Sequence, residues 1–132
     1  MLVFILDYKR IKLSIDKKII VFIYRYYLLK TSYQHKMFAT LALGKGNEKG
    51  TGGKMAGHYC VNLKCDPEEA VMLRDIFSSV IPGYHMNKAQ WNTVILDGSI
   101  PQGEIERMID NSYMLVVSKM AKKDQASLLL HL

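Results

Sequence analysis

The sequence predicts a single α+β domain in which strand-like segments and helices follow one another along the chain. Strand-like segments rich in β-branched and aromatic residues lie on both sides of a glycine-rich loop. Two later segments carry helix start signals followed by apolar residues at helical spacing. A length of 132 residues allows one modest core rather than two.

The first 35 residues differ in composition from the rest. They are rich in Ile, Lys, Tyr, Phe and Leu and contain no Gly, Pro, Asn or Ala. Residues 19–27 predict a strand, and a buried helix is the alternative because a continuous apolar run does not report its period. This run is far shorter than the roughly 20 residues that span a bilayer, and Asp7 and Asp16 interrupt a signal peptide. We therefore expect no membrane span and a cytoplasmic protein.

Residues 36–43 and 59–65 predict two further strands. Between them, residues 44–54 are dominated by Gly and Lys, so we expect a flexible hairpin loop with too little apolar surface to order itself. On the second of these strands Val61, Leu63 and Cys65 share one face. Cys60 falls on the other face, so the two cysteines should not pair and should remain reduced.

A helix should begin at residues 66–69, where Asp66 can cap, Pro67 fits the first turn and acidic residues follow. Its sheet-facing residues should be Ala70, Leu73, Ile76 and Phe77. The helix should end before a turn at residues 81–83.

Residues 91–96 predict another strand, closed by a turn at residues 97–98, and Pro101 should start the last helix. The inward stripe of that helix should consist of Ile105, Met108, Ile109, Ser112 and Val116. The helix should fade near residues 121–123 and leave residues 124–132 as a short tail.

The net charge of +6 is divided unevenly along the chain. Residues 1–54 hold eleven Lys and Arg and three Asp and Glu, a balance of +8, whereas residues 55–132 hold seven and nine, a balance of −2. The basic character therefore belongs to the N-terminal part and the Gly/Lys loop. A basic isoelectric point alone does not predict DNA binding by the C-terminal half.

Patterns of catalytic and metal sites are absent from the sequence. Residues 44–54 supply neither the P-loop pattern nor the third glycine of a dinucleotide fingerprint. His58, Cys60 and Cys65 lack zinc-ligand spacing, and no Ser, His and acid are brought together. We expect no enzyme activity, no metal and no cofactor, and a basic hairpin tip that can touch phosphates.

The most informative segment is residues 81–93, which crowds aromatic rings, amides and cations together. This mixture suits a surface that stacks on planar groups and donates hydrogen bonds to phosphate or base edges. The structural alternative is that Trp91 covers the core while Asn87 and Asn92 tie down a tight loop. The sequence leaves both interpretations open.

Motifs at residues 36–39, 61–67, 81–88, 91–94, 96–101, 108–113 and 115–117 occur in the order of a known family. Over residues 36–120 the chain resembles the MmcQ/YjbR family of small bacterial proteins, with residues 84–88 at the centre of the match. The resemblance implies a compact CyaY-like fold, similar also to secretion chaperones, with an antiparallel sheet packed against helices. Residues 36–123 would form this domain, and residues 1–35 do not match the helix with which family members usually open.

The resemblance also implies non-catalytic DNA binding through a double-wing arrangement, with the Gly/Lys loop as one wing. The residues expected to contact nucleic acid are Lys45, Lys49, Lys54, Lys64, Tyr84, His85, Asn87, Lys88, Trp91 and Asn92. Two other classes remain open: an interaction module with a protein partner, and a small-molecule-binding protein with a pocket around Tyr84 and Trp91. The oligomeric state is not specified by the sequence.

Overall fold

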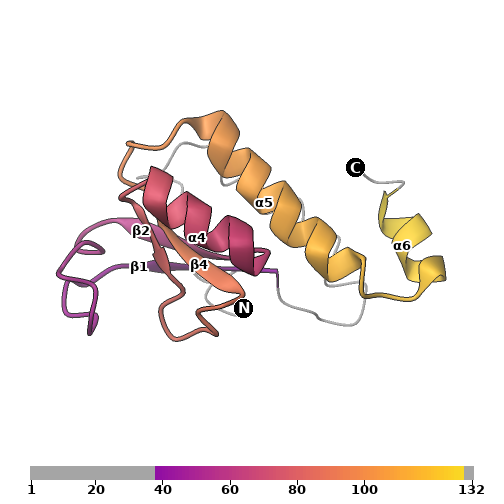
Figure 1. Ribbon diagram of the computed structural model, residues 1–132, viewed down its shortest axis with the longest axis horizontal. Coiled ribbons are helices and arrows are strands. Elements are labelled where there is room, and N and C mark those ends of the chain that lie inside the picture. The colour runs from indigo at the N-terminus through magenta and orange to yellow at the C-terminus, as the bar shows by residue number, and fades with distance from the viewer. Residues whose placement is uncertain (1–37, 130–132) are drawn as a thin grey trace.

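The computed structural model describes residues 38–129, which form a four-stranded antiparallel sheet backed by helices (Figure 1). The strands are β1 (Ala39–Leu43), β2 (Tyr59–Lys64), β3 (Val80–Pro82) and β4 (Trp91–Ile95), in the spatial order β1-β2-β4-β3. The expected α+β class, with an antiparallel sheet packed against helices, is therefore confirmed. The strand predicted at residues 19–27 lies outside the described residues.

The register of the central strands gives the sheet two different faces. Val61 pairs with Val94, and one residue further along Asn62 pairs with Thr93. Because successive side chains point to opposite sides of a strand, Val61 and Val94 point toward the helices while Asn62 and Thr93 point away from them. We call these sides the helix face and the second face.

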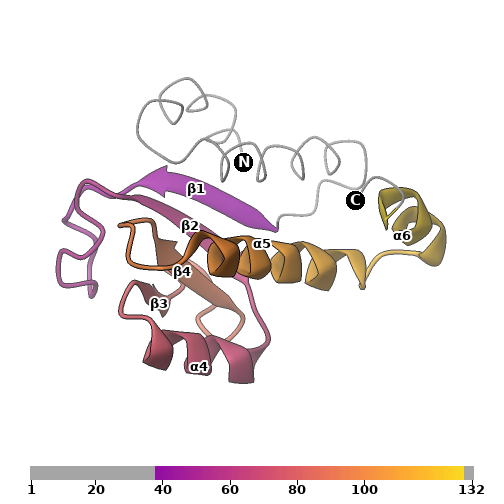
Figure 2. The ribbon, with the colours of Figure 1, turned by 90° about the horizontal axis from the view of Figure 1, so that it is seen from above.

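Helices α4 (Pro67–Ile76) and α5 (Gln102–Val117) cover the helix face. Helix α4 lies beside β3, as Figure 2 shows, and α5 packs on β2 and β1. The predicted start of α4 is confirmed, since the Asp66 carboxylate accepts a hydrogen bond from the backbone N–H of Glu68 at 3.1 Å.

The core lies between α5 and the sheet. Every residue of the predicted inward stripe of α5 is buried, including the polar Ser112. The Ser112 hydroxyl donates to the Phe38 carbonyl and accepts a hydrogen bond from the Lys64 backbone N–H, so it ties α5 to the ends of β1 and β2. A serine fits this stripe because both of these strand-end backbone groups need a partner.

The prediction that Ile76 faces the sheet is wrong. Its side chain is 64% exposed, and only Ala70 and Leu73 are buried along α4. The backbone becomes extended at Phe77, which packs partly buried against the core instead. The inward stripe of α4 is therefore narrower than the apolar spacing suggested.

Two other segments also differ from the sequence expectation. Residues 81–83 were expected to form a turn, but Val80–Pro82 is a strand that pairs with β4. This strand lies at the edge of the sheet, where proline removes no ladder hydrogen bond that the sheet needs. In addition, α5 ends at Val117 and a separate helix, α6 (Lys122–Leu129), follows where only a tail was expected.

We predict that Ile109→Ala lowers the free energy of unfolding by about 3 kcal/mol, because Ile109 is completely buried and its truncation leaves a cavity. Met114→Ala on the same helix removes a side chain that is 41% exposed and should cost less than about 1 kcal/mol. Urea unfolding measures both. Equal losses in the two variants would contradict the placement of the core.

Candidate nucleic-acid interface

The loop between β1 and β2, residues 44–58, has defined internal structure. Its ends are joined by hydrogen bonds from the Gly44 N–H to the His58 carbonyl and from the Gly57 N–H to the Gly44 carbonyl. The Glu48 carboxylate accepts hydrogen bonds from the backbone N–H groups of Lys45 and Gly46, at 2.6 and 2.8 Å. These backbone donors hold the pKa of Glu48 below its usual value.

The loop is also anchored by an apolar side chain. Met55 is buried, although the rest of the loop is mostly polar and exposed. A Cβ atom on Gly44 would lie 1.8 Å from the Met55 carbonyl oxygen, so the two ends of the loop can approach only because residue 44 is glycine. The expectation for this loop considered residues 44–54 alone, and Met55 lies just beyond that segment.

The loop between β3 and β4, residues 83–90, is held by hydrogen bonds at both ends. The Gly83 N–H donates to the Trp91 carbonyl at 2.9 Å, and the Trp91 N–H donates to the Asn87 carbonyl at 2.9 Å. The Lys88 ammonium donates to the Gly83 carbonyl at 3.1 Å. A Cβ atom on Gly83 would lie 2.8 Å from Trp91 Cβ, so this close approach also requires glycine.

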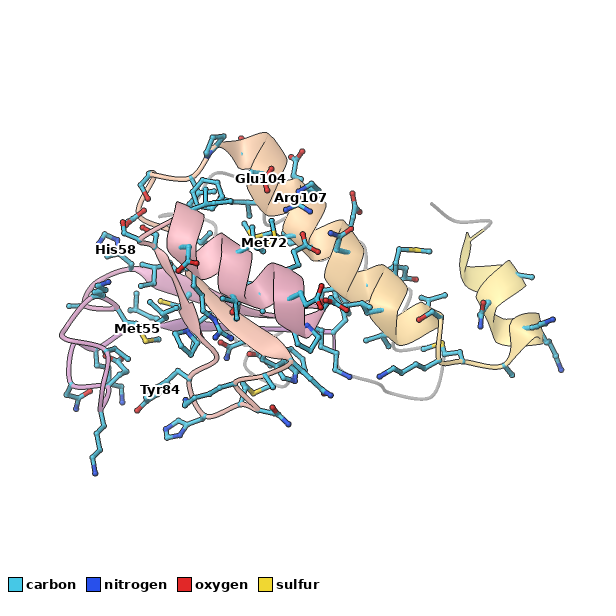
Figure 3. All side chains as sticks on the ribbon, viewed as in Figure 1. Met55, His58, Met72, Tyr84, Glu104 and Arg107 are labelled. Atoms are coloured by element: carbon cyan, nitrogen blue, oxygen red, sulfur yellow. The ribbon has the colours of Figure 1, made fainter. Side chains whose placement is uncertain are left out.

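A small apolar cluster brings the two loops together on the second face. Met55, Cys60 and Ile95 form its buried part, and Ile81 and Tyr84 pack against it. We call these five residues the bridging cluster. Figure 3 shows Met55 and Tyr84 close to one another, each coming from its own loop. The loop of residues 44–58 lies at one end of the sheet and the loop of residues 83–90 at the other. The two loops are neighbours because residues 83–90 fold back over the second face, where Tyr84 packs against the bridging cluster.

Beside the bridging cluster, three polar side chains form a hydrogen-bonded row across β1, β2 and β4. The Asn62 amide donates to the Thr40 hydroxyl at 3.0 Å and accepts a hydrogen bond from the Thr93 hydroxyl. The Thr93 hydroxyl also accepts from the backbone N–H of Tyr84 at 2.9 Å. This row fixes the backbone position of Tyr84 relative to the sheet.

Trp91 and Asn92 are buried and serve the fold. Trp91 is 6% exposed, and the Lys64 ammonium lies 5.7 Å from the centroid of a Trp91 ring, a cation–π distance. Asn92 is 2% exposed, and its amide donates to the Ala70 carbonyl at 3.3 Å. The Asn92 oxygen accepts from Arg74 Nε at 2.7 Å, while another nitrogen of Arg74 donates to the Lys88 carbonyl. Neither residue presents its side chain for contact with a ligand.

The ten predicted site residues therefore divide into groups. Six are exposed and lie on the two loops: Lys45, Lys49, Lys54, His85, Asn87 and Lys88. Tyr84 and Lys64 are half-buried, and Trp91 and Asn92 are buried. Sequence reasoning missed Arg74, which fixes the second loop to α4. A lone arginine on a helix that starts with glutamates suggests a surface ion pair and carries no signal of this role.

Charge is unevenly distributed over the described residues. Residues 38–129 hold ten Lys and Arg and ten Asp and Glu, so this part of the chain is neutral as a whole. The two loops hold four lysines and one glutamate, a local balance of +3. Helix α4 with its cap holds four acidic residues and Arg74, a balance of −3. We call the surface formed by the two loops, residues 44–58 and 83–90, the basic edge. The surface of α4 is acidic.

Both cysteines of the described residues are buried free thiols. Burial raises the pKa of the Cys60 thiol to about 12 and that of Cys65 to about 11, so both are protonated at neutral pH. Within residues 38–129 no group of three or more His, Cys, Asp and Glu could hold a metal ion. A groove of about 160 Å³ includes Lys64, Gln90 and Lys119 in its lining, but neither Tyr84 nor Trp91. In the same range no helix has the length and apolar character needed to cross a bilayer.

These features define a small α+β protein with a helix-backed antiparallel sheet and a basic edge made by two loops. The chain belongs to the YjbR family, whose model matches residues 22–115. The match confirms the resemblance inferred from the motifs. It begins at residue 22, so it also takes in part of the N-terminal segment that the motifs left outside.

Two relatives of this chain are described as uncharacterized proteins. It is 44% identical over 63 residues to the protein YjbR of Escherichia coli K12 and 40% identical over 72 residues to YbdF of Escherichia coli O157:H7. These alignments cover 48% and 54% of this chain and 53% and 59% of the relatives, so the chain spans a little over half the length of each.

Two solved structures share the fold. A Pseudomonas syringae protein, 33% identical, matches with a TM-score of 0.56 over 64% of this chain and 70% of its own. A Deinococcus radiodurans protein assigned to the DUF419 domain, 39% identical, matches with a TM-score of 0.50 over 53% and 52%. Neither description gives an activity, so the function of this chain has to be argued from its own surface.

We predict that Asn92→Ala lowers the free energy of unfolding by about 2 kcal/mol, because the Arg74 guanidinium and the Ala70 carbonyl both lose a hydrogen-bond partner. Asn87→Ala is the matched control, since the Asn87 amide is exposed and accepts only a local bond from the Ala89 N–H. Its cost should stay below about 1 kcal/mol. Thermal or urea unfolding that ranks Asn87→Ala as the more damaging change would contradict this assignment.

Proposed function

We propose that this protein binds nucleic acid without catalysing a reaction, through phosphate contacts made by its basic edge. The observation that carries the proposal is the charge separation between the two loops and α4. Lys45, Lys49, Lys54 and Lys88 are exposed on the loops, and the nearest acidic residue in the same loops, Glu48, is engaged with backbone N–H groups. Lysines placed in this way neutralise phosphates and release counterions.

The charge separation also supports one orientation of binding. A nucleic-acid backbone is attracted to the +3 of the loops and repelled by the acidic residues of α4, of which Glu69 alone is paired with Arg107, so the loops would face the ligand and α4 would face away. The bridging cluster keeps the two loops on the same side and lets their lysines act together.

A non-catalytic role is supported by the chemistry of the described side chains. The two cysteines are held protonated by burial, and the Ser112 hydroxyl is committed to structural hydrogen bonds. The described exposed groups on the basic edge are cations, rings and amides, which bind rather than react.

A charge-matched pair of variants tests the proposal. Lys45→Ala/Lys49→Ala/Lys54→Ala removes three charges from the basic edge, whereas Lys119→Ala/Lys122→Ala/Lys123→Ala removes three exposed charges at the far end of the molecule, near α6 (Figure 1). We expect the loop variant to bind DNA more weakly and to lower the slope of log K against log salt by about 2 to 3. The α6 variant should bind like the wild type. Equal weakening of both variants would show that net charge alone, not the basic edge, controls binding.

A protein-docking role is a second candidate, and the outer surface of α4 is the observation that favours it. Val71, Met72 and Ile76 are more than half exposed there, and the acidic residues Glu68 and Asp75 lie among them. Large apolar side chains exposed together mark interaction sites. Charge complementarity indicates a partner segment that carries Lys or Arg among its own apolar side chains.

For this candidate the probe is a synthetic amphipathic peptide of Lys and Leu, compared with one in which Glu replaces Lys. The Lys peptide should bind the wild type and lose at least about tenfold in affinity with Met72→Ser/Ile76→Ser, while the Glu peptide should not bind. Calorimetric titration measures the affinities. Unchanged binding by the double variant would exclude the α4 surface as the docking site.

A further inference from the structure

The turn at residues 83–86 displays two neighbouring rings, tilted relative to one another, at the basic edge. The Met86 N–H donates to the Gly83 carbonyl at 3.2 Å, which makes Tyr84 and His85 the two central residues of a β-turn. The centroids of the Tyr84 and His85 rings are 4.0 Å apart, with 46° between their planes. His85 is exposed, so its ring is the outer member of the pair.

The backbone at His85 is strained in order to hold this position. His85 has φ +57°, and it is the only described non-glycine residue with a positive φ. Glycine or asparagine is the usual residue at such a turn position, because a side chain there costs energy. A non-glycine residue in this backbone conformation on an exposed turn points to a role for its side chain.

The support beneath the ring pair is rigid. Tyr84 packs on the bridging cluster, and its backbone N–H is bound by Thr93, so the phenol ring has a fixed base on the sheet. Trp91, the other aromatic residue that the sequence suggested for stacking, is buried and cannot stack on a ligand. The described basic edge therefore offers one rigid aromatic platform, flanked by the exposed Lys88 and, through Met55, by the loop that carries Lys54.

We propose that the ligand of the basic edge is single-stranded nucleic acid, with an unpaired base stacking on the His85 ring while the loop lysines contact the backbone. This proposal rests on the proposed nucleic-acid binding and specifies its ligand. Bases in a duplex are stacked on one another and do not offer a ring face to a protein surface, whereas bases of a single strand do. An exposed platform among lysines is therefore useful only for a single strand.

The test compares a labelled oligodeoxythymidine with the same strand annealed to its complement, at one low salt concentration, by fluorescence anisotropy. Wild type should bind the single strand more tightly than the duplex. His85→Gly should weaken single-strand binding roughly five- to hundredfold, the range expected for one base stack, and leave duplex binding unchanged. His85→Tyr, which keeps a ring, should restore single-strand binding.

His85→Gly also separates loss of the ring from loss of the fold. Glycine accepts the φ of +57° without strain, so this variant should melt at the same temperature as wild type or higher. Equal affinity for both forms, or no effect of His85→Gly on single-strand binding, would overturn the single-strand proposal and leave phosphate binding standing. Absence of binding to either form would overturn the proposed function as well.

Discussion

The buried amide of Asn92 is the interaction on which the candidate surface depends. It joins the start of β4 to α4 through the Ala70 carbonyl and receives Arg74, which in turn holds the Lys88 carbonyl. One buried carboxamide therefore sets the position of α4, β4 and the second loop relative to one another. Because a buried amide without partners is costly, this mutual arrangement of sheet, helix and loop is stabilised over arrangements that leave Asn92 unpaired.

This constraint separates two roles within residues 83–92. Gly83, Trp91 and Asn92 make the close contacts that shape the loop, whereas His85 is displayed on it; Lys88 is exposed and also donates to the Gly83 carbonyl. The structural interpretation therefore holds for Trp91 and Asn92, which are buried, while contact of the exposed residues with a ligand stays a prediction. Some residues of the family motif, such as Gly83, Trp91 and Asn92, shape the loop. The exposed residues of the same motif, His85 and Lys88, belong to the candidate contact surface.

Local rules of sequence predicted most of the fold. The cap at Asp66 depends on helix-end chemistry, and the buried stripe of α5 depends on the spacing of apolar residues. Both can be recognised in a single sequence. Strand β3 and the burial of Met55 were missed, because both depend on tertiary contacts and not on a local pattern: pairing with β4 for the strand, and packing with Cys60 and Ile95 for Met55. For the candidate site, the sequence places the lysines on a loop, where they are exposed, and their contact with a ligand stays a prediction. The burial of Asn92 and the role of Arg74 could not be predicted, since they arise from one contact across the domain.

If the proposed function is correct, ligand contact is confined to the exposed residues of the two loops, while the buried members of residues 81–93 hold the loops in place. This can be measured by titrating the isotope-labelled full-length chain with an oligodeoxythymidine and following its amide and side-chain NMR shifts. We expect the largest shifts at Lys45, Lys49, Lys54, His85 and Lys88, with little change along α5 or at Lys122 and Lys123. Shifts centred on α5 or α6, with the two loops unaffected, would contradict the proposed function.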